Sequence, residues 1–197
     1  MLIYFYINCA FLASATPCLQ GLRRLPLLWK EPIKTVSNNT IEKKVWIQAS
    51  AEIVFRALTS AKALEQWFCD KASSDPRAEG ELVAHWNDGK NRRVGRAVFT
   101  RVDPLSVVAL RWMDDVCGED TVAAHTLSYE IHPRSGMTEL VMTDSDETEM
   151  DAEIIEFLAQ GWNAVLLELK DYCEHKERAA KKNSMAASAN SVDKARM

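Results

Sequence analysis

The sequence predicts an α+β domain in which a curved, antiparallel six-stranded sheet wraps round a long C-terminal helix, with two short helices after the first strand. Three observations support this prediction. An alternating segment precedes two short helical patterns, five strand-like runs joined by turn signals follow, and a long amphipathic pattern closes the order. The 197 residues, of which 47% are hydrophobic and 26% charged, suffice for one domain with a sizeable core.

The first strand is predicted at residues 41–49, where apolar and polar side chains alternate with a period of two. Ser50 follows as a credible N-cap. Apolar residues then recur at helical spacing in two stretches, 51–58 and 61–67, with a break between them. These stretches are the two short helices.

Five strand-like runs follow, and a turn signal separates each run from the next. The signals include Asn87-Asp88-Gly89 and the proline-containing stretch 103–106. Because the connections are short, neighbouring runs are expected to pair as an antiparallel meander. The predicted strands are 81–86, 92–102, 107–113, 121–131 and 137–143.

The last predicted element is an amphipathic helix of about 27 residues. It follows Thr148 and Asp151, which resemble a capping box, and its apolar residues recur every three or four positions as far as Cys173. The acidic run 144–153 is interpreted as carboxylates gathered at the start of this helix, where the helix dipole favours them. The first and last strands can pair only if the sheet wraps round this helix.

The two ends of the chain differ in composition from the body between them. Residues 1–39 are expected to be an extension and linker outside the core, and residues 40–178 to form the domain. Residues 179–197 are rich in Ala, Ser, Lys and Asn and contain no aromatic residue. They are expected to be a disordered tail, because they bury too little apolar surface to offset the entropy of ordering.

The N-terminal segment bears on localisation. Residues 1–22 carry no charged side chain, and the Ala-Ser-Ala stretch at 13–15 resembles a cleavage site. Two arginines follow the apolar run and none precedes it, which opposes the usual export orientation. We therefore expect a cytoplasmic protein, with export or anchoring as the alternative. No run reaches the roughly 18 apolar residues of a spanning helix, so no stable membrane insertion is expected.

Charge and ligand spacing exclude several classes of partner and cofactor. Residues 40–177 hold 15 basic and 26 acidic residues, a net charge of −11, which repels phosphate backbones and argues against nucleic acid as a partner. The five cysteines show no CxxC spacing, so reduced thiols are predicted rather than a disulfide framework or a zinc site. The four histidines show no metal-ligand spacing, and neither a metal nor another cofactor is predicted.

Four segments carry a family signal when they are taken in order. They are the opening 49–59, Leu64-Glu65-Gln66-Trp67-Phe68, Gly95 with Val102-Asp103-Pro104 and Leu110-Arg111-Trp112, and Gly161-Trp162 with Leu169-Lys170 and Tyr172. Together they resemble the START-like, or SRPBCC, superfamily and, within it, the C-terminal domain of the activator of the heat-shock protein 90 ATPase. The resemblance covers residues 41–176 and implies the helix-grip fold, also called pollen-allergen-like.

The resemblance also implies a choice of functions. Superfamily members bind lipids or other apolar ligands, serve as cyclases, or assist a chaperone. We predict a non-enzymatic binder of an apolar small molecule or lipid, held between the sheet and the long helix. The alternatives are a co-chaperone-like module that stimulates a chaperone ATPase, and a polyketide cyclase-like enzyme.

The candidate ligand contacts are side chains expected on the inner face of the sheet and on the long helix; the alternative is a filled core without a cavity. His125 and Arg96 are the polar candidates, and neither has an evident nucleophile or general base beside it, so no catalytic residue is predicted. A buried carboxylate within hydrogen-bond reach of His125 and open to the pocket would overturn the non-enzymatic prediction and favour the cyclase alternative. The full set of candidates is Trp67, Trp86, Arg96, Phe99, Trp112, His125, Tyr129, Leu158 and Trp162.

Overall fold

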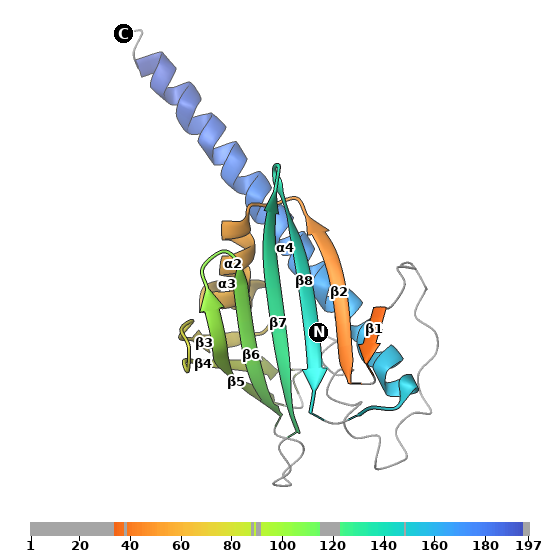
Figure 1. Cartoon of the computed structure of the whole chain (residues 1–197). Helices are drawn as coiled ribbons and strands as arrows, with labels where there is room; N and C mark the ends of the chain where they lie inside the picture. The colour runs from red at the N-terminus through yellow and green to blue at the C-terminus, as the bar shows by residue number, and fades with distance from the viewer. Residues whose placement is uncertain are drawn as a thin grey trace.

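The computed structural model describes residues 34–37, 39–87, 89, 92–114, 123–147 and 149–194. Within these residues, one antiparallel sheet of eight strands curves across the molecule in the order β1-β2-β8-β7-β6-β5-β4-β3. Helix α4 (Ala152–Lys194) lies behind the sheet, and α2 (Ala51–Thr59) and α3 (Ala61–Trp67) lie beside it (Figure 1). This is the predicted α+β, helix-grip architecture.

All six predicted strands are present, with ends that differ by a few residues from the predicted ones. Two short strands that the sequence did not predict, β1 and β3, add one strand to each edge and raise the number from six to eight. Four residues are too few to show a period of two, so neither strand carries a recognisable pattern. The strands are β1 (Lys34–Ser37), β2 (Thr40–Ile47), β3 (Lys71–Ser74), β4 (Glu81–Asn87), β5 (Arg92–Asp103), β6 (Val107–Asp114), β7 (Ala123–Arg134) and β8 (Met137–Asp146).

The two short helices are α2 (Ala51–Thr59) and α3 (Ala61–Trp67), close to their predicted bounds. Ser50 occupies the N-cap position of α2, but its side chain makes no capping hydrogen bond to the helix. Its backbone N–H instead donates to Oε2 of Glu177 at 3.0 Å. The long helix α4 therefore contacts the start of α2.

The sheet closes round α4 through the pairing of its first long strand with its last. β2 runs antiparallel to β8 over its whole length, from the pair Thr40–Ser145 to the pair Ile47–Thr138. This confirms that the first and last predicted strands are neighbours. The pairing curves the sheet and gives it an inner face, toward α4, and an outer face.

The core lies between the inner face and α4. Alternation places Phe99, Leu140 and Met142 on the inner face, and all three are fully buried. From α4, Leu158 and Trp162 point into the same core, with exposures of 3% and 2%. Four residues separate them, which places them on one face of the helix, as predicted.

Two elements lie wholly or partly outside the predicted domain of residues 40–178. β1 lies inside the stretch that was interpreted as a linker, and α4 (Ala152–Lys194) continues through most of the predicted tail. Alanine and lysine have high helix propensity even at solvent-exposed positions. A segment without apolar side chains can therefore lack core contacts and still be helical. The domain limits themselves stay a prediction, and the proposed cleavage site lies outside the described residues.

Candidate functional site

Four aromatic side chains gather at one end of the inner face, and we call them the aromatic cluster: Trp67, Phe68, Trp86 and Trp112. The ring centroid of Phe68 lies 5.2 Å from that of Trp67, 5.5 Å from that of Trp86 and 6.1 Å from that of Trp112. Trp112 is buried, whereas the other three rings are partly exposed. The cluster therefore extends from the surface of the molecule into its core.

Backbone contacts and a glycine hold the cluster in place. Nε1 of Trp86 donates to the carbonyl of Phe68 at 2.7 Å, and Nε1 of Trp67 donates to the carbonyl of Ala57 at 3.0 Å. Gly95 lies beneath the rings: a Cβ atom there would come within 2.9 Å of Trp86 and 3.0 Å of Trp112. The missing side chain leaves the space that the two indoles occupy.

Beside the cluster lies a buried polar group, which we call the buried triad: His125, Asp144 and Trp162. Nδ1 of His125 lies 2.6 Å from Oδ1 of Asp144, and Nε1 of Trp162 donates to Oδ2 at 2.7 Å. The side chains of His125 and Asp144 are 10% and 8% exposed. Both carboxylate oxygens are thus engaged within the protein, as burial of a charge requires.

Strand register joins the cluster to the triad. His125 on β7 lies opposite Trp112 on β6 on one side and opposite Asp146 on β8 on the other. Asp144 is the inward-facing residue of β8 next to Asp146. Alternation turns His125, Asp144 and Trp112 to the same face of the sheet. The aromatic cluster, His125 and Asp144 therefore form one continuous row across the inner face, and Trp162 of α4 contacts this row at Asp144.

The pKa of the buried Tyr129 hydroxyl reflects the electrostatic environment of this row. Tyr129 lies two inward-facing positions from His125 on β7, beyond Leu127, and is 5% exposed. Burial raises the pKa of its hydroxyl far above the ordinary value, and the charge of Asp144 raises that pKa further. The surroundings of the triad therefore oppose the formation of a second negative charge.

The triad can fix the protonation of an imidazole. A carboxylate only accepts hydrogen bonds, so Nδ1 of His125 carries the proton that it shares with Asp144. This contact orients the ring, and an oriented imidazole is a group that can take part in proton transfer. One of the two conditions set for the cyclase alternative is thus met: a carboxylate lies within reach of His125, and both groups are nearly buried. The other condition is that this carboxylate opens on a pocket.

The structure places the nine predicted candidates unequally. Eight lie on the inner side: three in the cluster, two in the triad, and Phe99, Tyr129 and Leu158 in the adjoining core. Arg96 does not join them, because it is exposed on the outer face of β5. The register is regular through Gly95, and the only irregularity in the β5–β6 pairing falls between Phe99 and Arg101, so nothing turns Arg96 inward.

Two side chains of this site escaped the sequence prediction. Phe68 stands beside Trp67 in the quoted motif but was not chosen as a contact. Asp144 was assigned to the acidic run before the long helix, although it shares the inward parity of Leu140 and Met142 on β8. That parity is a signal that strand periodicity alone could have supplied. Among the described residues, no three His, Cys, Asp or Glu side chains group closely enough to hold a metal ion.

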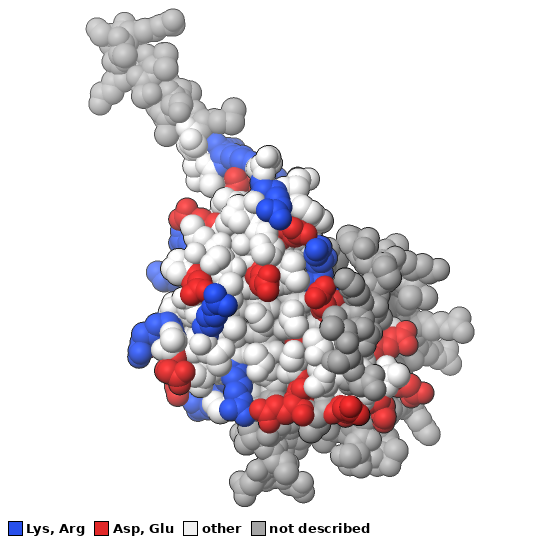
Figure 2. Space-filling view, in the orientation of Figure 1, with Lys and Arg blue, Asp and Glu red and all other residues white. Residues whose placement is uncertain are grey.

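The outer face of the sheet has a different character. Its centre is mostly uncharged, and acidic side chains gather along the edge at which β8 ends (Figure 2). Three large apolar side chains are exposed on this face: Trp46 at 45%, Val94 at 41% and Met113 at 38%. Trp46 on β2 is separated in the sheet from Val94 on β5 and Met113 on β6, and singly scattered apolar side chains are common on protein surfaces.

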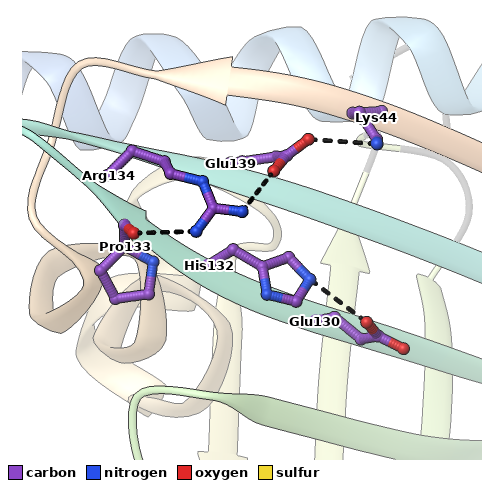
Figure 3. A network of polar contacts seen from close by, with 6 residues as sticks. All are labelled: Lys44, Glu130, His132, Pro133, Arg134 and Glu139. Atoms are coloured by element: carbon purple, nitrogen blue, oxygen red, sulfur yellow. Dashed lines mark hydrogen bonds and ion pairs between the residues drawn. The ribbon is translucent and has the colours of Figure 1, made fainter.

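A polar network lies beside Trp46 on the outer face (Figure 3). Glu139 accepts from Lys44 at 3.1 Å and from Arg134 at 3.3 Å, and His132 lies 3.2 Å from Glu130. The hydrogen bond from Lys44 holds the pKa of Glu139 below its ordinary value. This network pairs an almost buried carboxylate with two cationic side chains.

Fold and site together define a START-like protein: an antiparallel sheet that grips one long helix, with aromatic and polar side chains between them. The sequence model of the family described as activator of Hsp90 ATPase homolog 1-like protein matches residues 48–174, and the chain belongs to this family. A search of curated proteins found no match.

Solved structures share the fold at low sequence identity. A protein from Rhodobacter sphaeroides is 18% identical with a TM-score of 0.63, over 75% of this chain and 98% of that one. The Aha1 dimer from Colwellia psychrerythraea is 21% identical with a TM-score of 0.56, over 68% and 96%. CalU16 from Micromonospora echinospora is 16% identical with a TM-score of 0.53, over 76% and 86%. None of the described helices is both long and apolar enough to cross a membrane.

Proposed function

We propose that this chain binds a planar, apolar small molecule between the inner face of its sheet and α4, without catalysing a reaction. The observation behind the proposal is the continuous row formed by the aromatic cluster and the buried triad. Its outer members are partly exposed and its inner members face α4, so aromatic surface extends from the outside of the molecule toward the core. Flat indole and phenyl rings favour a planar ligand over an acyl chain, because offset stacking adds to the burial of apolar area.

A neutral fluorescent probe, N-phenyl-1-naphthylamine, tests this proposal. We expect its emission to rise on titration with the full chain, because the probe leaves water for an apolar site. Phe68→Ala removes the central ring of the cluster without removing a side-chain hydrogen bond and should weaken binding several-fold. Trp46→Ala, at an exposed aromatic side chain on the outer face, is the control and should bind as the unaltered chain does. Equal affinities for all three proteins would reject the proposed site.

A cyclase-like enzyme is the second candidate, and the contact between His125 and Asp144 favours it. An oriented imidazole is the group that abstracts or returns a proton in such reactions. Native mass spectrometry of protein purified from its own host separates the two candidates. If the retained ligand is released with its mass and structure unchanged after prolonged incubation, the binder is supported. If the mass or structure of the ligand has changed, the enzyme is supported.

The chaperone-directed alternative draws on the family description and on the exposed Trp46 and Met113 of the outer face. Tryptophan is enriched among the residues that dominate protein interfaces. An ATPase assay with the host's heat-shock protein 90 tests this alternative. If the chain is a small-molecule binder, ATP turnover should stay unchanged, whereas stimulation that Trp46→Ala abolishes would favour the co-chaperone instead.

A further inference from the structure

We propose that the exposed side of α4 pairs, in antiparallel orientation, with α4 of a second copy of this chain. The inference goes beyond the proposed function and does not depend on any ligand. It follows from three properties of the side of α4 that faces away from the sheet: which side chains are exposed there, how their charges are distributed, and where the large apolar side chain among them lies.

The exposed side chains form a stripe along the helix, which we call the α4 stripe. They recur at intervals of three, four or seven residues, which places them on one side of the helix. Leu158 and Trp162, which face the core, lie on the other side. The α4 stripe consists of Glu153, Glu156, Gln160, Leu167, Asp171 and Arg178, all of them exposed.

The charges of the stripe change sign along the helix. Glu153 and Glu156 lie near its start, whereas Arg178 and, almost one turn further, Lys181 lie toward its end. The side chains of Arg178 and Lys181 are 67% and 65% exposed, and each also pairs with a glutamate four residues earlier, at 3.8 and 3.2 Å. Exposed pairs of this kind are weak, and both cationic groups have further donors for a second carboxylate. The stripe can therefore attract a basic surface at one end and an acidic surface at the other.

The spacing of these residues makes the stripe complementary to itself. Leu167 is eleven residues from Glu156 and eleven from Arg178. It is fourteen residues from Glu153 and fourteen from Lys181. An antiparallel pair of α4 helices with its two-fold axis at Leu167 therefore places each of these basic residues opposite an acidic residue of the second copy. A parallel pair would instead place like charges opposite each other.

The centre of the stripe also favours a second copy over an unrelated partner. Leu167 is 52% exposed, more than any other large apolar side chain among the described residues. The two-fold pairing would place the two Leu167 side chains against each other and remove both from water. Asp171 would lie opposite Asn163. Gln160 would lie opposite Glu174, so no two like charges would meet along the stripe.

Sedimentation velocity of the full chain over a series of protein concentrations tests the proposal. We expect a monomer–dimer equilibrium whose dissociation constant rises at least about fivefold between about 0.05 and 0.5 M NaCl, because salt screens exposed charges. A full chain that stays monomeric at every concentration would leave the stripe to another occupant and overturn the proposal.

Two substitutions of exposed apolar residues locate the contact. Leu167→Glu places two like charges at the two-fold axis and should leave only monomer at concentrations at which the unaltered chain is dimeric. Met113→Glu, on the outer face of the sheet, is the matched control and should dimerise as the unaltered chain does. Dimerisation that survives Leu167→Glu, or that Met113→Glu abolishes, would place the contact elsewhere and overturn the proposal.

A charge swap tests the antiparallel orientation. Glu156→Arg and Arg178→Glu should each raise the dissociation constant about tenfold, because the symmetry turns two attractive pairs into two repulsive ones. The combined variant restores opposite charges in both pairs and should dimerise nearly as tightly as the unaltered chain. Both positions are exposed, so the fold of each variant should be unaffected. If the combined variant dimerises more weakly than either single variant, these residues do not face each other and the orientation is wrong.

Discussion

Trp162 serves the core and the buried triad with different parts of one side chain. Its ring is 2% exposed among the apolar residues between α4 and the sheet. Its single N–H donates to Asp144, which would otherwise lose one of its two partners inside the protein. Replacing the ring and replacing only the N–H should therefore have separable costs.

Two substitutions at this position measure those costs. Trp162→Ala should lower the free energy of unfolding by about 3–5 kcal/mol, because it removes a large buried ring. Trp162→Phe keeps an aromatic ring but leaves a carboxylate oxygen without its donor, and should cost about 1–3 kcal/mol. Urea denaturation measures both, with Trp46→Phe on the outer face as the control. If Trp162→Phe were as stable as the unaltered chain, the hydrogen bond to Asp144 would contribute nothing.

Gly95 offers a second test at the scale of a residue. The Cβ of an alanine there would press on the rings of Trp86 and Trp112 at 2.9 and 3.0 Å, so Gly95→Ala must displace part of the aromatic cluster. We expect a loss of about 1–3 kcal/mol in the free energy of unfolding. Val94→Ala, at the exposed neighbouring position, should change it little. Equal effects of the two substitutions would show that the rings have room to move.

At the scale of elements, two carboxylates attach α4 to the turn between β2 and α2. Glu174 accepts from the backbone N–H of Gln48, and Glu177 accepts from that of Ser50, both at 3.0 Å. Gln48 and Ser50 lie between the end of β2 and the start of α2. Their N–H groups are therefore outside the hydrogen-bond ladder of the sheet and need other acceptors. The attachment joins residues 126 and 127 positions apart in the sequence.

This attachment should make stability depend on pH. The hydrogen bond from the Ser50 backbone lowers the pKa of Glu177 below its ordinary value of 4.5. Its contribution is therefore complete above pH 4.5 and is lost as the pH falls through the lower pKa of the folded state. Glu177→Gln should be less stable than the unaltered chain at neutral pH, by about 1 kcal/mol or less, and the difference should vanish in acid.

Thermal unfolding across pH 2–7 measures this difference. Glu168→Gln, at an exposed position on the same helix, supplies the control and should show no comparable pH dependence. A stability gap between Glu177→Gln and the unaltered chain that stays constant down to pH 2 would contradict the expected protonation of Glu177.

At the scale of the whole molecule, α4 is longer than the sheet that it crosses, and its C-terminal part projects beyond the body (Figure 1). The last residue of α4 that is buried among the described side chains is Cys173, and residues 178–184 are exposed. The helix therefore divides into a part that belongs to the core and a part that adds length without packing.

Two truncations test this division. A chain that ends at Arg178 should melt cooperatively within about 3 °C of the full chain, because it loses no described core contact. A chain that ends at Asp171 loses Cys173 and both carboxylates that hold the β2–α2 turn, and should melt far lower. Similar melting temperatures for the full chain and for the chain that ends at Asp171 would mean that α4 beyond Asp171 contributes nothing to the stability of the fold.

The local patterns that predicted the elements succeeded where the pattern was long. β5 and β8 have 12 and 10 residues, enough for alternation to be counted, whereas the four residues of β1 and of β3 show none. Edge strands of that length form because a neighbouring strand offers free N–H and C=O groups, which is a property of the sheet. The extent of α4 was underestimated because an exposed helix was judged by its lack of apolar side chains.

The candidate site divides in the same way. The sequence by itself determined the inward parity of Trp112 and His125 and the helical stripe that carries Trp162, because periods of two and of 3.6 are local properties of the chain. Only the tertiary structure decided that His125, Asp144 and Trp162 meet, and that Arg96 stays outside. Their contacts depend on strand register and on the closure of the sheet round α4, and both are set by backbone pairing between segments far apart in the sequence.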